Sequence, residues 1–166
     1  MHLLGYTAAA ILMGASAAQA ELNIRFVESA PKDRFEISWT GSCALAAGEI
    51  EIDLAPAPAD LVFDTEEGGR GVEVYQPFEV AAGGELITNA PRVKDGAKQI
   101  TLSHAKMQPG AAFVFTIDVD DAAGNRLGPI RVSGSEMAGT VVRTKTGSNA
   151  AFSDDNLAAL SLGACS

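Results

Sequence analysis

The fold is decided by the stretch Ala112-Phe-Val-Phe-Thr-Ile-Asp-Val-Asp-Asp121. Every second side chain in it is apolar, namely Phe113, Phe115, Ile117 and Val119. A period of two is typical of a strand with one face in the core and one face in water. Turn residues flank the stretch, with Pro109-Gly110 before it and Gly124-Asn125 after it. We therefore predict one half-buried strand over residues 112–121.

Further short strands are expected along the rest of the chain, separated by Gly, Pro, Asn and Asp. Alternating runs cover residues 22–26, 35–39, 49–54 and 100–102, and shorter apolar or β-branched runs cover 61–63, 86–87, 130–132 and 140–144. Residues 72–80 are also expected to form strands, interrupted or bulged at Pro77. This spacing predicts an all-β fold, an immunoglobulin-like or jelly-roll-like antiparallel β-sandwich of about 7–10 strands. The predicted core contains Phe35, Ile37, Trp39, Ile50, Ile52, Phe113, Phe115, Ile117 and Val119.

The end of the chain permits two interpretations. Residues 149–152 and 157–162 can form a final hairpin joined by Ser153-Asp-Asp-Asn156. Alternatively, Ser153 caps a short helix, because Leu157 and Leu160 have helical spacing and alanine favours helix. The hairpin is the preferred interpretation.

The first twenty residues form a predicted export signal and are excluded from the fold argument. They contain an uncharged apolar segment and end in Ala18-Gln19-Ala20, a small-x-small cleavage site. The segment is short and rich in Ala and Gly for a membrane span. We predict a single mature domain over residues 21–166, secreted or periplasmic and not embedded in a membrane.

The chain is acidic, with 21 Asp and Glu against 12 Lys and Arg and a net charge of −9. Nucleic acid is an unsuitable partner because its phosphates would be repelled. Carboxylates spread along the chain are consistent with solubility or with binding of divalent cations.

The two cysteines, Cys43 and Cys165, predict one structural disulfide, since an isolated pair in an exported chain is most simply bonded.

A calcium site is one hypothesis for the carboxylates at the end of the central strand. Asp118, Asp120 and Asp121 supply a dense set of oxygens, with Asn125, Glu66 and Glu67 as weaker candidates. The spacing lacks the distal Glu of an EF-hand. Asp118 and Asp120 share one strand face, so both can point at one ion. In the alternative interpretation, they solvate the outer face of the sheet and Asp121 caps a turn. Asp118 and Asp120 could also form the acid–base pair of a glycosidase, but equal exposure is expected for both, which argues against a catalytic pair.

Catalytic constellations are weak in this sequence. The only histidine of the mature chain is His104, and no nucleophile-elbow motif joins it to Ser103 or Ser133. One histidine also leaves too few soft ligands for a transition metal. For glycan or protein binding, the best exposed aromatic candidate is Tyr75, while Phe78 is expected to pack in the core.

Four phrases of the chain carry a family resemblance: residues 30–35 (APKDRF), 71–78 (GVEVYQPF), 115–121 (FTIDVDD) and 132–136 (VSGSE). They resemble small bacterial secreted proteins described as similar to the core of the sponge aggregation factor. The resemblance implies calcium-dependent adhesion at the cell surface and supplies no catalytic residues.

Export, acidity and the missing catalytic constellations predict a secreted, non-enzymatic adhesion or recognition module. Calcium is its possible cofactor, and its partner is a cell-surface or extracellular protein or glycan. A carbohydrate-binding or carbohydrate-active protein and a purely structural extracellular domain are the alternatives.

Overall fold

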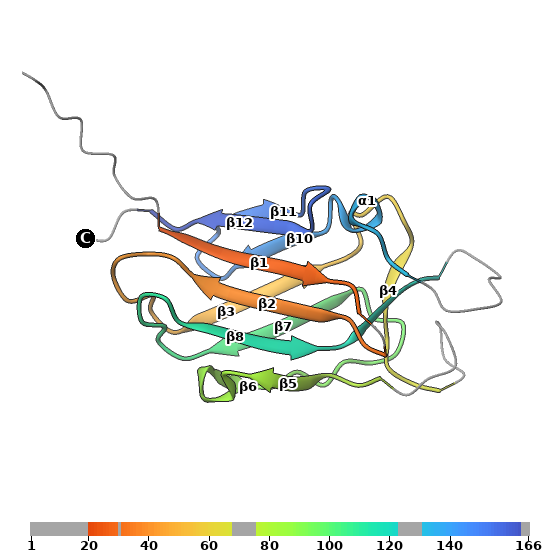
Figure 1. Cartoon of the computed structure of the whole chain (residues 1–166), viewed down its shortest axis with the longest axis horizontal. Helices are drawn as coiled ribbons and strands as arrows, with labels where there is room; N and C mark the ends of the chain where they lie inside the picture. The colour runs from red at the N-terminus through yellow and green to blue at the C-terminus, as the bar shows by residue number, and fades with distance from the viewer. Residues whose placement is uncertain (1–19, 30, 68–75, 123–130, 164–166) are drawn as a thin grey trace, which may run out of the picture.

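The protein folds as two antiparallel sheets packed face to face, with a small ribbon at one end (Figure 1). The computed structural model describes residues 20–29, 31–67, 76–122 and 131–163. The first sheet contains, in spatial order, β12 (Leu157–Ser161), β1 (Glu21–Val27), β2 (Arg34–Trp39), β8 (Ala112–Thr116) and β5 (Glu79–Ala82). The second contains β11 (Asn149–Ala151), β10 (Val141–Thr144), β3 (Gly48–Asp53), β7 (Gln99–His104) and β6 (Ile87–Asn89). The predicted all-β antiparallel sandwich is confirmed.

The ribbon pairs β4 (Leu61–Asp64) with β9 (Asp118–Asp121) and belongs to neither main sheet. In Figure 1, β4 runs steeply across the end of the sandwich. Two short helical elements complete the described chain, the 3-10 turn η1 (Gly84–Leu86) and the helix α1 (Gly134–Met137). No helix among the described residues is long and apolar enough to cross a membrane.

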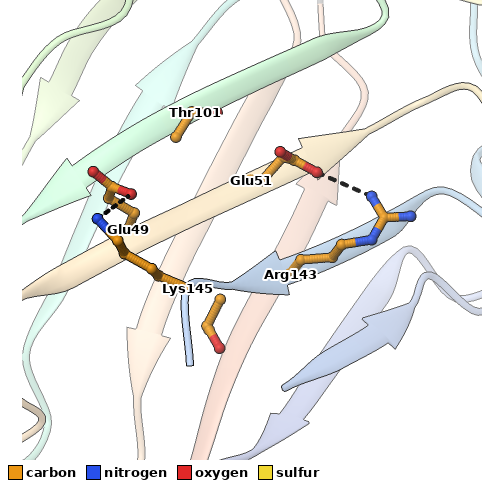
Figure 2. A pocket seen from close by; sticks show the side chains of 6 residues that line it. Glu49, Glu51, Thr101, Arg143 and Lys145 are labelled. Carbon is orange, nitrogen blue, oxygen red and sulfur yellow. Dashed lines mark hydrogen bonds and ion pairs between the residues drawn. The ribbon is translucent and has the colours of Figure 1, made fainter. Parts of the chain in front are cut away.

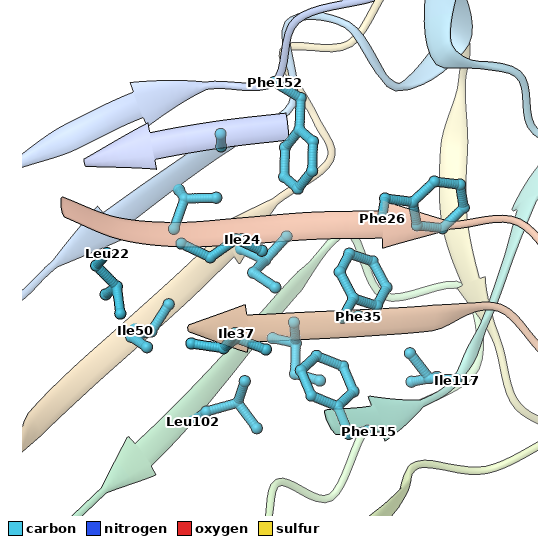
Figure 3. Packing of buried hydrophobic residues seen from close by; sticks show 14 of the residues in the cluster. Leu22, Ile24, Phe26, Phe35, Ile37, Ile50, Leu102, Phe115, Ile117 and Phe152 are labelled. Carbon is cyan, nitrogen blue, oxygen red and sulfur yellow. The ribbon is translucent and has the colours of Figure 1, made fainter. Parts of the chain in front are cut away.

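The core lies between the two main sheets, where alternate side chains of facing strands meet (Figure 3). Every core residue predicted above is buried. Aromatic rings line one part of it, with Phe35 stacked on Phe115 at a centroid distance of 5.1 Å and Phe78 tilted against Phe115 at 4.9 Å. The expected core packing of Phe78 is therefore confirmed.

The stretch 112–121 forms two strands, which corrects the prediction of one. β8 ends at Thr116 and β9 begins at Asp118, with Ile117 between them. The apolar alternation continues through the junction, since Phe115, Ile117 and Val119 are all buried. Hydrogen-bond partners change there: β8 pairs with β2, whereas β9 pairs with β4. Side-chain period alone does not reveal such a change of partner.

The described chain contains twelve strands, more than the predicted range. The stretch 112–121 contributes two strands, and the edge strands β6 and β11 correspond to the short runs predicted at residues 86–87 and 149–152. The strand predicted at residues 130–132 was wrong in its described part, because residues 131 and 132 belong to no strand.

Residues 157–161 form a strand rather than a helix. β12 pairs with β1 in the first sheet, whereas β11 pairs with β10 in the second. The turn between them, with Asn156 in the left-handed region at φ 61°, therefore carries the chain from one sheet to the other. The strand prediction was right and the pairing of the two strands as a hairpin was wrong.

The two ends of the described chain lie side by side. Glu21 is paired with Ser161, and the Leu162 N–H donates to the Ala20 carbonyl at 3.1 Å. The rest of the predicted export signal and Cys165 lie outside the described residues. Cys43 is partly buried, and its carbonyl accepts a hydrogen bond from Trp39 Nε1 at 2.6 Å. No described cysteine is free, and the pairing of Cys43 with Cys165 stays a prediction.

Candidate metal centre

The pairing of β4 with β9 brings together carboxylates that are distant in sequence. Asp64 is directly opposite Asp118, and Val62 is opposite Asp120. Because strand side chains alternate, these four side chains share one face of the ribbon. One carboxylate oxygen from each of Asp64, Asp118 and Asp120 lies within 4.8 Å of the other two. We call these three residues the acidic triad.

The acidic triad is largely withdrawn from water. Asp64 is fully buried, Asp120 is 1% exposed and Asp118 is half-buried. Neither carboxylate oxygen of Asp64 has a hydrogen-bond donor in the described chain. Carboxyl groups of Asp95 and Asp120 approach Asp64 instead, and a carboxylate can accept but cannot donate. A buried anion with no donor is costly unless a proton or a cation neutralises it.

Asp33 and Asp95 fix the surroundings of the triad through backbone contacts. Asp33, from the β1–β2 connection, accepts from the Ser29 and Val119 N–H groups, each at 3.1 Å. Asp95 accepts from the Thr65 N–H at 3.0 Å. Backbone N–H groups in or next to the ribbon, those of Val119 and Thr65, therefore hold the two carboxylates beside the triad.

Burial and mutual repulsion make these carboxyl groups weak acids. Burial raises the pKa of Asp64 to about 7, and the neighbouring Asp95 and Asp120 add to the effect. Burial raises the pKa of Asp118 to about 8, with Asp120 and Asp33 as the next contributions. Burial also raises the pKa of Asp33 to about 7, against the opposing effect of its two backbone hydrogen bonds. A divalent cation would reverse this balance by favouring the ionised forms.

The oxygen ligands that the triad offers fit a hard divalent cation. All three ligand groups of the triad are carboxylates, and hard cations such as Ca²⁺ and Mg²⁺ take oxygen ligands. Neither oxygen of Asp64 has a hydrogen-bond partner among the described residues, so a proton or a bound cation is needed to neutralise this buried group. Asp64, Asp118 and Asp120 are the residues that would hold the ion.

The structure gathers only some of the predicted ligands. Asp118 and Asp120 do share a face, but their expected equal exposure was wrong, because Asp120 is buried and Asp118 half-buried. Asp121 lies on the opposite face by alternation, opposite Leu61. Glu66 and Glu67 are exposed and lie outside the triad. Asn125 and Tyr75 lie outside the described residues.

Sequence reasoning missed Asp64 and Asp33. Asp64 comes directly after the predicted strand at residues 61–63, and a carboxylate at the end of an apolar strand could have indicated a candidate ligand. Asp33 follows Pro31 and Lys32 in a connection, and nothing local distinguishes it from a turn residue.

The side chains considered for catalysis serve local structure. His104 is buried, and its Nδ1 lies 2.8 Å from the Ala105 carbonyl oxygen. Ser133 caps α1, accepting from the Glu136 N–H at 3.4 Å while Glu136 accepts from the Ser133 N–H at 2.7 Å. This Ser-x-x-Glu capping box predicts a helix start from sequence, and that signal was missed.

A second polar region lies on the outer face of β3, β7 and β10. It is a shallow groove of about 280 Å³ lined by Glu49, Glu51, Thr101, Arg143, Thr144 and Lys145 (Figure 2). Its charges are paired across strands, with Lys145 3.4 Å from Glu49 and Arg143 3.0 Å from Glu51. This pairing leaves little uncompensated charge for a ligand.

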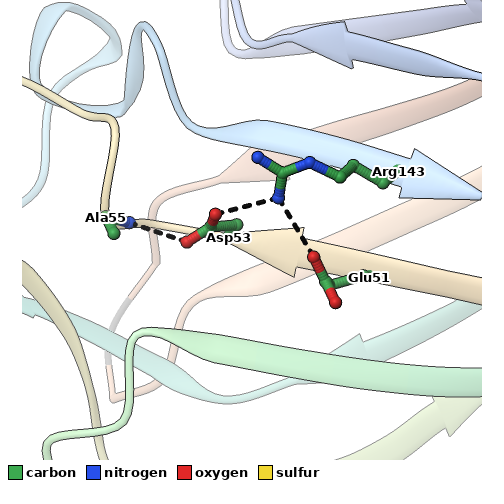
Figure 4. A network of polar contacts seen from close by, with 4 residues as sticks. All are labelled: Glu51, Asp53, Ala55 and Arg143. Carbon is green, nitrogen blue, oxygen red and sulfur yellow. Dashed lines mark hydrogen bonds and ion pairs between the residues drawn. The ribbon is translucent and has the colours of Figure 1, made fainter.

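Arg143 also contacts Asp53 at 2.8 Å (Figure 4). Burial of Asp53 favours the neutral acid, but hydrogen bonds from Arg143, the Ala55 N–H and Gln99 hold its pKa below the ordinary value. Asp53 thus differs from the buried aspartates of the triad, because it has both a cation and an N–H donor beside it.

Comparisons with protein-family models, with curated proteins and with solved structures found no match for this chain. The resemblance to secreted proteins similar to the sponge aggregation factor core therefore stays a prediction.

Proposed function

We propose that this protein is an exported, non-enzymatic recognition or adhesion module whose fold is stabilised by a divalent cation, with calcium as the preferred ion. The observation that carries the proposal is Asp64, a fully buried carboxylate without a hydrogen-bond donor, opposite Asp118 in the ribbon. Extracellular modules bind calcium with dissociation constants of about 10⁻⁴–10⁻³ M, and the predicted export would place the protein where calcium is abundant.

Calcium fits better than magnesium on the character of the site. Magnesium keeps several of its water ligands and demands near-octahedral geometry, whereas calcium accepts irregular sets of carboxylate oxygens. Asp64 and Asp120 are buried, so few water ligands can reach an ion from their side. The same burial supports a structural role, since an ion enclosed by the ribbon is poorly placed to contact a partner. Recognition would then use the surface, on a fold that the ion holds.

The test combines titration calorimetry with thermal melting of the mature chain, in calcium, in magnesium and in chelator. Calcium at a hundredfold excess over Kd should stabilise the protein by about 2.7 kcal/mol, which is roughly 5–10 °C in Tm for a domain of this size. Asp64→Asn should abolish binding and the shift. The matched control is Asp121→Asn, on the same strand but the opposite face, which should keep both. No calorimetric binding, or an equal shift in Asp64→Asn, would remove the site.

Glycan recognition is the second candidate, favoured by a groove on the outer face of the first sheet. The groove measures about 500 Å³, and its lining includes Asn23, Arg25, Glu36, Ser38 and Leu157. These side chains offer amide, hydroxyl and charged groups beside an apolar wall, a mixture that suits a sugar. NMR titration with neutral tetrasaccharides tests it: shifts confined to the groove and lost in Ser38→Tyr support the candidate, and unchanged spectra reject it.

A further inference from the structure

We infer that the cation acts as a latch on the β4–β9 ribbon alone, so that without it the ribbon opens locally while both main sheets stay folded. The inference rests on the cation site proposed above and adds which part of the molecule that site controls. It concerns a minor open state, because Leu61, Phe63 and Val119 of the ribbon belong to the core and their exposure is costly.

Among the described residues, few backbone hydrogen bonds join the ribbon to the rest of the sandwich. On the β4 side, Phe63 forms an isolated bridge with Ala97: the Phe63 N–H donates to the Ala97 carbonyl at 2.8 Å, and the Gly96 N–H donates to the Phe63 carbonyl at 2.9 Å. The Thr65 N–H is bound by the Asp95 carboxylate. A strand of a main sheet, by contrast, is paired along its length, as β3 is with β7 and β10.

On the β9 side, the ties converge on one residue. The Ile117 N–H donates to the Asp33 carbonyl at 3.1 Å, and the Val119 N–H donates to the Asp33 carboxylate at 3.1 Å. The Asp33 carboxylate in turn feels the charges of Asp120 and Asp118. A cation that neutralises the acidic triad therefore also reduces the charge repulsion on Asp33, the residue that binds β9 to the sandwich.

Closing the ribbon is what brings the like charges together. Asp64 and Asp118 belong to different strands and are directly opposite each other, a placement that destabilises a strand pair. The main sheet has the reverse arrangement, with Arg143 opposite Glu51 and bonded to it at 3.0 Å. The directly opposed like charges thus lie in the ribbon, with Asp33 and Asp95 adding to the repulsion from adjoining connections, and an ion bound by both strands removes that repulsion only while the ribbon is closed.

The experiment is amide hydrogen exchange by NMR on the mature chain, across low urea concentrations, in chelator and in calcium. In chelator, the Phe63, Ile117 and Val119 amides should exchange together, roughly tenfold or more faster than the slowest amides of β2, β3 and β7. They should also show a smaller urea dependence, because a local opening exposes less surface than global unfolding. Calcium at a hundredfold excess over Kd should slow the exchange of these amides by about a hundredfold. Their exchange cannot become slower than the exchange that occurs through global unfolding.

The variants separate this inference from the site itself. Asp64→Asn should leave ribbon exchange insensitive to calcium, and Asp121→Asn should respond as the wild type does. Suppose calorimetry detects binding, but the ribbon amides in chelator share the rate and full urea dependence of the slowest core amides. The latch is then refuted while the site stands. Absence of calorimetric binding would overturn both proposals.

Discussion

Replacing Asp64 by Asn should stabilise the cation-free protein, and by an amount that grows with pH. Asn has nearly the shape of Asp but cannot ionise. The folded-state pKa of Asp64, about 7, exceeds that of an unfolded aspartate by about three, and each pKa unit is worth about 1.4 kcal/mol. Ionising Asp64 in the folded protein therefore costs about 4 kcal/mol as an upper estimate.

The sign of the pH dependence follows from which state holds the proton more tightly. The folded state does, so the contribution of Asp64 to stability is fully present below about pH 4 and is lost as pH rises to about 7. The Asn variant has no such loss. Its advantage should grow from about 2 kcal/mol at pH 5 to about 4 kcal/mol at pH 7.5. Asp118, whose pKa is raised in the same direction, keeps part of the pH dependence in the variant.

The assay is urea unfolding in chelator at several pH values, followed by the fluorescence of the single tryptophan, Trp39, which is 3% exposed. With an m-value of about 2 kcal/mol/M, the midpoint difference at pH 7.5 should approach about 2 M. Added calcium should narrow the gap, because only the wild type gains stability. A variant that is less stable than the wild type at pH 7.5, or a gap that does not change with pH, would refute the electrostatic account of the triad.

Three further predictions concern the rest of the molecule. The non-reduced mature protein should be lighter than its sequence by two hydrogens if Cys43 and Cys165 are bonded, and Cys165→Ser should then lower Tm; reactive thiols in the denatured protein would exclude the bond. Phe115→Ala should cost about 3–5 kcal/mol in urea unfolding, because the ring is fully buried between two other rings, and a cost below about 1 kcal/mol would contradict that packing. Arg143→Gln should cost about 1 kcal/mol at low salt and less in 1 M salt, since it removes a partly exposed ion pair with Asp53; a cost independent of salt would indicate lost packing instead.

Much of the fold could be predicted because apolar and polar residues alternate along a half-buried strand, which shows which face lies in the core. The alternation around Phe35, Ile50 and Phe115 identifies core positions without knowledge of strand order. The alternation within one strand does not show with which other strand it pairs. The change of partner at Ile117, and the crossing between sheets after β11, depend on residues far along the chain.

Only part of the candidate site could be predicted, because strand pairing decides which other carboxylates join it. Asp118 and Asp120 share a face by local periodicity, whereas Asp64 joins them only through the register of a strand more than fifty residues earlier. The burial of these carboxylates could not be predicted either. A carboxylate on the polar face of a strand is normally solvated, whereas here that face is covered, as the 1% exposure of Asp120 shows.

The pairing of β1 with β12 has a mechanical consequence. Because Glu21 is opposite Ser161 and Leu162 bonds to Ala20, both ends of the described chain leave from the same end of one strand pair. A force that pulls these ends apart would load the rungs one at a time, which unzips the pair, whereas a shearing force would load them together. A Cys43–Cys165 bond would change the path of that force. The pull would then pass into the loop that Trp39 holds through its indole N–H, and the ladder between β1 and β12 would be spared.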